Sequence, residues 1–273
     1  MKTCYYYQTF VGLSDVLNQP NNVDQIIISS IHFDDGKTDI EIFLNDYSPE
    51  DKRFNNMWKE TKSCKEKGIE ILAMMGGAGL AFHVFFSEFS KTYPLLLNFF
   101  KKRPWITGID LDVEEYVDIN NIKKLINKLK QDMGSEFVIS MAPLGSSLAN
   151  DVSGMGGFNY KTLYNSPEGK YINYFHAQCY NGSFTENMFA SIVKNKYPPE
   201  KIIMGMMSGD YGVNNFENAL TEVKNILNTY PNMGGVFDWE YLDAPPDPKN
   251  PIMWANKFKN LNNLNNYTSC LIN

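Results

Sequence analysis

The sequence predicts a single (β/α)8 barrel of the TIM type, formed by residues 1–273 as one domain. Short apolar runs alternate with longer amphipathic segments along the whole chain, and this order is typical of repeated βα units. Eight such units fit into 273 residues, a length that suits one closed barrel. No linker or change in composition divides the chain, so a second domain is not expected.

The apolar runs and the helical patterns define the elements in order. The predicted strands span residues 5–10, 25–33, 69–75, 106–114, 137–141, 174–180, 202–207 and 235–239. The predicted helices span residues 49–67, 82–102, 119–132, 186–196, 215–229 and 251–264. Residues 37–44 alternate between polar and apolar, which indicates a hairpin strand in the second crossover.

Composition restricts the classes of partner. The net charge is −6, and no Lys/Arg cluster lies on one periodic face, so neither nucleic acid nor a membrane surface is expected as a partner. The N-terminus runs straight into an aromatic strand without the pattern of a signal peptide, which favours a cytoplasmic location without establishing it. The scattered Cys4, Cys64, Cys179 and Cys270 fit reduced, mostly buried thiols better than a disulfide framework or a metal site.

Three acidic residues mark the candidate site. In a strand, Asp110, Asp112 and Glu114 share one face, while the aliphatic residues between them share the other. Crowding like charges and burying them both cost free energy, so such a cluster usually serves chemistry. The alternatives are a metal site or an edge strand with its acids in water.

The histidines give no support to a metal centre. His32, His83 and His176 show no metal-ligand spacing, and each is interpreted as an ordinary hydrogen-bonded side chain. Neither a metal ion nor another cofactor is expected.

These motifs resemble one known family. Residues 107–114 (TGIDLDVE) resemble the D-G-x-D-x-D-x-E signature of glycoside hydrolase family 18, the chitinases and endo-β-N-acetylglucosaminidases, with Thr107 in place of the first Asp. Residues 141–143, 177–181 and 234–241 match further family motifs in the expected order. Residues 74–79 resemble its S-x-G-G motif but lack the Ser, which leaves the local hydrogen bonding open. The resemblance spans essentially the whole chain.

The resemblance implies a role for each acid. Glu114 would be the general acid that protonates the glycosidic oxygen. The nucleophile would be the 2-acetamido oxygen of the substrate itself, so this family departs from the two-carboxylate scheme. Asp112 would orient the acetamide N–H, and Asp110 would share a proton or hydrogen bond with Asp112. Tyr180 would hydrogen-bond the acetamide carbonyl from the opposite wall.

The resemblance also implies a set of substrate contacts. Trp239 would form the floor of the sugar pocket, because an indole face matches the apolar face of a pyranose. The expected substrate-binding residues are Gln178, Trp239, Met141, Asn181, Gly76 and Gly77. As alternatives, Gln178 and Tyr180 satisfy buried polar groups, Trp239 fills core, and Met141 only packs.

The resulting hypothesis is a glycosidase that cleaves β-1,4 linkages of N-acetylglucosamine-containing glycans, such as chitin or chito-oligosaccharides. An endo-β-N-acetylglucosaminidase acting on N-glycans is an alternative, and the protein is expected to act as a monomer. A chitinase-like sugar-binding protein without activity is the rival; such members typically lose the acid at the position of Glu114, which this chain retains. A barrel enzyme that uses the acids to hold a divalent metal ranks last, because no glycine-rich phosphate loop accompanies them.

The stretch between the last two predicted strands limits the shape of the site. Residues 208–234 leave room for one helix, so the α+β insertion that walls the cleft of many chitinases is not expected. We therefore expect an open groove, suited to endo-acting or glycan-trimming activity.

Overall fold

Eight parallel strands close into a barrel in the computed structural model, which describes residues 1–34, 39–210 and 215–270, with side chains as far as residue 261. In order around the barrel they are β1 (Lys2–Tyr7), β2 (Gln25–Asp34), β4 (Glu70–Gly76), β5 (Gly108–Asp112), β6 (Val138–Met141), β7 (Tyr174–Gln178), β8 (Ile202–Met207) and β9 (Gly235–Trp239). Strand β1 pairs in parallel with both β2 and β9, which closes the sheet. The predicted fold class is therefore confirmed.

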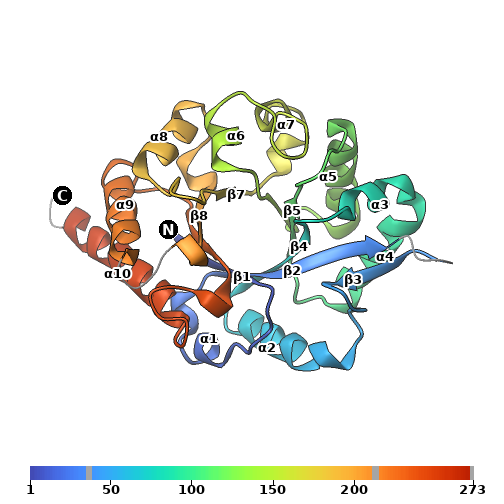
Figure 1. The fold of residues 1–273 in the computed structure, drawn as a ribbon, viewed down its shortest axis with the longest axis horizontal. Coiled ribbons are helices and arrows are strands. Elements are labelled where there is room, and N and C mark those ends of the chain that lie inside the picture. The colour runs from blue at the N-terminus through green and yellow to red at the C-terminus, as the bar shows by residue number, and fades with distance from the viewer. Residues whose placement is uncertain (35–38, 211–214, 271–273) are drawn as a thin grey trace.

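Helices surround the barrel on all sides (Figure 1). The longer ones are α2 (Asn55–Glu66), α3 (Ala81–Ser87), α4 (Phe89–Lys102), α5 (Ile119–Met133), α8 (Glu186–Lys194), α9 (Phe216–Thr229) and α10 (Ile252–Cys270). Three helices of five residues add to them: α1 (Ser14–Asn18), α6 (Gly145–Ala149) and α7 (Tyr160–Tyr164). None of these three was predicted, because five residues are too few to show a helical period.

The predicted helix over residues 82–102 is divided. Helix α3 ends at Ser87 and α4 begins at Phe89, with Glu88 between them in a non-helical conformation. The hydroxyl of Thr92 donates to the carbonyl of Phe85 at 2.6 Å, and so satisfies an acceptor at the C-terminus of α3. Periodicity alone did not reveal this break.

The expected hairpin strand is present as β3 (Glu41–Leu44), which pairs antiparallel with β2. Residues 37 and 38 of the predicted hairpin lie outside the described residues. Between β8 and β9, the described residues form only the short helix η5 (Ser208–Asp210) and α9, so the fold there fits the absence of an α+β insertion.

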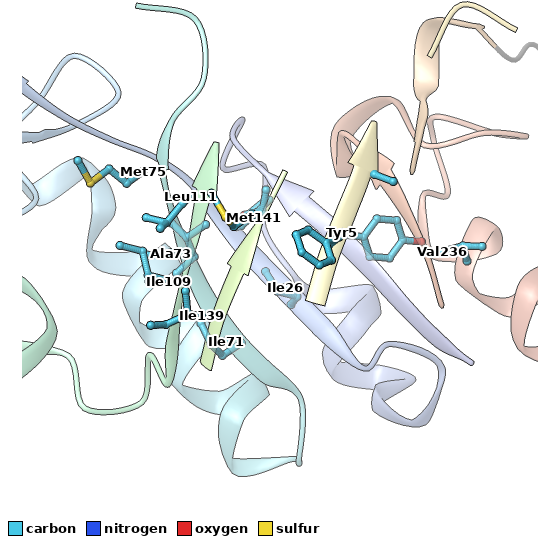
Figure 2. Close-up of a cluster of buried hydrophobic side chains, with 14 of the residues drawn as sticks. Tyr5, Ile26, Ile71, Ala73, Met75, Ile109, Leu111, Ile139, Met141 and Val236 are labelled. Carbon is cyan, nitrogen blue, oxygen red and sulfur yellow. The ribbon is translucent and has the colours of Figure 1, made fainter. Parts of the chain in front are cut away.

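The two faces of the strands build two separate cores. The outward faces pack against the helices, and Figure 2 shows Ile109, Leu111 and Met141 side by side in this layer. The inward faces fill the barrel with a smaller cluster: Cys4, Tyr6, Ile27, Leu72, Met74, Val138, Ile203 and Phe237. Alternation along β5 therefore directs Asp110 and Asp112 into the barrel, as predicted.

Two further expectations concern the cysteines and membranes. Cys4, Cys64 and Cys179 are free thiols with buried side chains, whereas the side chain of Cys270 lies outside the described residues. Across the described chain, no helix is long and apolar enough to cross a membrane.

We expect Gly205→Ala to destabilise the protein. A Cβ at Gly205 in β8 would lie 1.8 Å from Cζ of Phe237, whose ring fills the barrel interior. Overpacking of this kind typically costs about 1–3 kcal/mol. Urea unfolding would measure the loss, with Gly209→Ala as the control, because a Cβ there meets nothing within 4 Å. Equal midpoints for the two variants would contradict the packing argument.

Candidate active site

The three acids rise from the barrel interior to its C-terminal mouth. Asp110 is 0% exposed and Asp112 is 5% exposed. Strand β5 ends at Asp112, two residues before the predicted end, so half-buried Glu114 lies in the loop that follows. Carboxyl ends of barrel strands are the usual position of catalytic groups in this fold. The column therefore runs from a buried acid to one that solvent and a substrate can reach.

Asp110 is an anion held by donors from three other strands. Its Oδ1 accepts from the hydroxyl of Ser140 at 2.6 Å and lies 2.9 Å from Nδ1 of His176, while Oδ2 accepts from the hydroxyl of Tyr6 at 2.7 Å. Burial by itself raises the pKa of Asp110, but the charge and hydrogen bonds of His176, with those of Ser140 and Tyr6, outweigh it and leave the pKa below its usual value.

Asp112 has the opposite electrostatic environment. Burial, followed by the neighbouring charges of Glu114 and Asp110, raises the pKa of Asp112 well above its usual value. Its backbone carbonyl accepts from the N–H of Gly77 at 2.9 Å. A Cβ at Gly76 would lie 2.1 Å from that carbonyl oxygen, and the φ of Gly76 is +104°, so glycine is required for this approach.

Gln178, which ends β7 two strands away from β5, contacts the two upper acids. Its Nε2 lies 3.1 Å from Oδ1 of Asp112, 3.3 Å from Oε1 of Glu114 and 2.8 Å from the carbonyl oxygen of Ala142. One amide nitrogen therefore lies within hydrogen-bonding distance of both carboxyl groups and of a backbone carbonyl.

Glu115 anchors the loop that carries the candidate acid. Its carboxylate accepts from the backbone N–H groups of Phe82 and His83 at 2.6 and 3.0 Å, in the first turn of α3. Because Glu115 adjoins Glu114, these bonds hold the loop after β5 against α3.

Tyr180 and Trp239 lie at the mouth, on β7's C-terminal extension and at the end of β9. The Trp239 ring is half-buried and packs on Tyr6, with ring centres 5.2 Å apart. Tyr180 is half-buried against Phe237, and burial together with the charge of Asp112 raises its pKa well above the usual value. Both side chains thus pack on the inner core at the mouth and are partly exposed.

Two of the predicted contacts are less direct. Met141 is fully buried on the outward face of β6, so the structure does not bring its side chain to the acids (Figure 2). Its placement supports the alternative in which it only packs. Asn181 is exposed beyond Tyr180, and its N–H donates to Asp210 at 2.5 Å.

Sequence reasoning did not identify Tyr6, Ser140 and His176 as parts of the site. Ser140 is a polar residue within an apolar strand, and its inward register was the signal that could have found it. His176 shares the inward register of Gln178, but only the closed barrel shows that it faces Asp110 across the interior.

A cavity of about 850 Å³ opens between the ends of β1 and β2 and the β3 hairpin. Its lining includes Gln8, Phe10, His32, Phe43, Tyr47 and Ala78. Ala78 follows the Gly76–Gly77 turn that contacts Asp112, but none of the three acids lines this cavity.

Comparisons with solved structures cover nearly the whole chain. A fungal endo-β-N-acetylglucosaminidase from glycosyl hydrolase family 18 aligns with a TM-score of 0.84 and 26% identity, over 96% of this chain and 98% of that one. The chitinase ChiC from Aspergillus fumigatus aligns with a TM-score of 0.81 and 28% identity, over 94% and 98%. A GH18 chitinase from Pseudoalteromonas aurantia shares the fold, with a TM-score of 0.74, 19% identity and coverage of 96% and 100%.

Sequence comparisons add little to this. No protein-family model matches the chain. A curated protein, a probable metallo-hydrolase from Methanocaldococcus jannaschii, is 29% identical over 128 residues, which span 45% of this chain and 60% of that protein. Within the ranges that the structure describes, no group of three or more His, Cys, Asp or Glu is placed to hold a metal ion.

We expect Asp112→Asn and Asp110→Asn to change stability in opposite directions. Folding raises the pKa of Asp112. The stability that this side chain contributes therefore falls as the pH rises from the pKa of Asp112 in the unfolded chain toward its pKa in the folded protein. The Asp112→Asn substitution should therefore raise the melting temperature at pH 8. The pKa of Asp110 is lowered, so its ionised form stabilises the fold above the unfolded pKa, and the Asp110→Asn substitution should lower the melting temperature there.

Melting curves at pH 8 and pH 4 would measure both effects. The gain of the Asp112→Asn variant should shrink at pH 4, where the unmutated side chain is protonated at less cost. A loss of stability of similar size in both variants at pH 8 would contradict the assignment of opposite environments.

Proposed function

We propose that this chain, which shares its barrel and about a quarter of its residues with two glycoside hydrolase family 18 enzymes, is itself a glycosidase acting on N-acetylglucosamine-containing glycans. One observation carries the proposal: Gln178 joins the carboxyl groups of Asp112 and Glu114 at the barrel mouth, directly above the anionic Asp110. The arrangement supplies one accessible acid and one buried acid that differ in environment, as general acid–base chemistry requires.

Glu114 is the general acid in this proposal. It is the member of the column that solvent reaches, so a glycosidic oxygen can approach its carboxyl group. Proton donation to that oxygen lets the leaving sugar depart as an alcohol rather than as an alkoxide.

Asp112 orients the substrate. Its buried carboxyl group lies 3.1 Å from Nε2 of Gln178 and beside Glu114, where a proton can pass from Asp112 to Glu114 as substrate binds. The resulting carboxylate accepts the N–H of the 2-acetamido group and turns the acetamide oxygen toward the anomeric carbon. That oxygen attacks, and water later opens the cyclic intermediate with overall retention of configuration.

Trp239 and Tyr180 position the reacting sugar. Trp239 ends β9, which lies opposite β5 in the eight-strand barrel, and its ring packs on Tyr6 of the inner cluster. A pyranose lying on this ring would have its anomeric carbon toward Asp112 and Glu114, with the Tyr180 hydroxyl near the acetamide.

Chitin or chito-oligosaccharide is the proposed substrate, and the core of N-glycans is the alternative. The two family 18 enzymes that share about a quarter of their residues with this chain differ in this respect, one being a chitinase and the other an endo-β-N-acetylglucosaminidase. Mass spectrometry of the products from chitin oligomers and from a high-mannose glycoprotein, offered in parallel, would distinguish the two.

We expect Glu114→Gln to abolish most turnover while binding survives. Glutamine keeps the shape and the contact with Gln178 but has no proton to give. General-acid assistance is worth about 10²–10⁴-fold, so hydrolysis of chitin oligomers should fall by at least about 10². A nitrophenyl glycoside needs less help and should lose less, and the ratio of the two kcat/KM values measures acid catalysis.

Asp112→Asn is the matched control. Asp112 contacts the acetamide group that both substrates carry, so this substitution should lower kcat/KM for both substrates by a similar factor. Near-normal hydrolysis by Glu114→Gln would contradict the assignment of the acid. If the unmutated protein binds both glycans without cleaving either, the enzyme proposal fails and the sugar-binding alternative replaces it.

We expect Trp239→Ala to weaken sugar binding more than folding. Stacking on an aromatic ring is worth on the order of 1–3 kcal/mol if values for bases carry over to sugars. Calorimetric titration with a chitin oligomer should therefore show weaker binding, while the melting temperature changes little because the ring is only half-buried. A much lower melting temperature with unchanged affinity would show that Trp239 is a core residue.

A further inference from the structure

A continuous row of hydrogen-bonded side chains crosses the barrel interior beneath the acid column. It begins at the half-buried Lys2, whose Nζ lies 3.1 Å from Oε2 of Glu70. The same carboxylate oxygen accepts from Nε2 of Gln25 at 2.7 Å. Gln25 Oε1 then lies 2.8 Å from Nε2 of His176, and His176 Nδ1 lies 2.9 Å from Oδ1 of Asp110.

Each link fixes the orientation of the next. A carboxylate only accepts hydrogen bonds, so Glu70 requires the amide nitrogen of Gln25 on its side and directs the amide oxygen to His176. An amide oxygen also only accepts, so Nε2 of His176 carries a hydrogen. The second ring nitrogen then faces Asp110, and one proton lies between them.

The surroundings of Asp110 decide where that proton is. Asp110 also accepts from the hydroxyls of Ser140 and Tyr6, at 2.6 and 2.7 Å. Burial raises the pKa of Asp110, but the charge of His176 and the bonds from His176, Ser140 and Tyr6 outweigh it and lower that pKa, which favours the carboxylate form. Both members of the His176–Asp110 pair are 0% exposed.

The remaining neighbours of His176 do not offer a competing charge. The rings of Tyr6 and Phe237 contact the imidazole edge-on, with centres 5.9 and 5.7 Å away. The charged groups nearest along the network are Asp110 above it and the Lys2–Glu70 pair beyond Gln25.

We propose that His176 is a positioning residue: oriented by Gln25 and Glu70, it is held as a buried imidazolium that keeps Asp110 anionic and leaves a single proton for Asp112 and Glu114. The catalytic part of this proposal rests on the proposed function. The substrate step needs Asp112 as an acceptor and Glu114 as a donor at the same moment. One proton shared by these two acids meets that need, whereas an uncharged residue at 176 would let Asp110 compete for it.

The protonation state can be measured without any substrate. Nitrogen NMR of the ¹⁵N-histidine-labelled full chain would report both ring nitrogens of His176 between pH 5 and 9, with His176→Gln identifying its signals and exposed His83 as the internal reference. We expect two protonated-type nitrogens throughout this range. A neutral ring with one bare nitrogen would overturn the proposal.

The pH dependence of hydrolysis tests the consequence. Removing a cation makes the neighbouring acids bind protons more tightly, so His176→Gln should move the acidic limb of kcat/KM to higher pH, by about one pH unit or more. Ser140→Ala is the matched control, because it removes a bond to the same Asp110 oxygen without removing charge. It should lower the rate with a much smaller displacement of the limb.

If the acidic limb of kcat/KM moves equally in both variants, or does not move in His176→Gln, the charge of His176 does not have the proposed role. The two proposals remain separable. A neutral His176 in a protein that cleaves chitin oligomers refutes this inference and leaves the proposed function. An imidazolium in a protein that cleaves nothing at any pH refutes the proposed function, and the catalytic role of His176 with it.

Discussion

The burial of an ionised carboxylate inside the barrel is the constraint on which the rest of the site depends. An unpaired buried anion is costly, so Asp110 requires donors from several directions at once. These donors are Tyr6 on β1, Ser140 on β6 and His176 on β7, and all three lie within hydrogen-bonding distance of its carboxyl group. Only a closed barrel brings strands so distant in the sequence to one point.

That constraint gives two acids on one strand opposite properties. Asp110 is surrounded by donors and its pKa is lowered, whereas Asp112 lies between two other acids and its pKa is raised. A protein selected for stability alone would not retain Asp112 in this position, since a buried acid with a raised pKa weakens the fold at neutral pH. The proposed function supplies a reason to keep it, because proton transfer needs a group that changes its protonation state easily.

The mouth of the barrel depends on the same interior layer. Trp239 packs on Tyr6, and the hydroxyl of Tyr6 donates a hydrogen bond to Asp110. Tyr6 therefore contacts both the proposed floor of the sugar pocket and the lowest of the three acids. Gln178 ties the upper two acids together, and Glu115 ties their loop to α3. The β3 hairpin, which pairs with β2, helps to line a separate cavity.

The sequence by itself determined the repeated βα order, the hairpin and the inward face of β5, because side-chain periodicity depends only on local geometry. It also placed Tyr180 and Trp239 at the ends of predicted strands. The tertiary structure decided which side chains complete the site: Met141 turns to the outer core, while His176 and Ser140 meet Asp110. The register and the closure of the sheet determine which of these side chains come into contact. Both properties depend on strands that are far apart in the sequence, so no short segment encodes them.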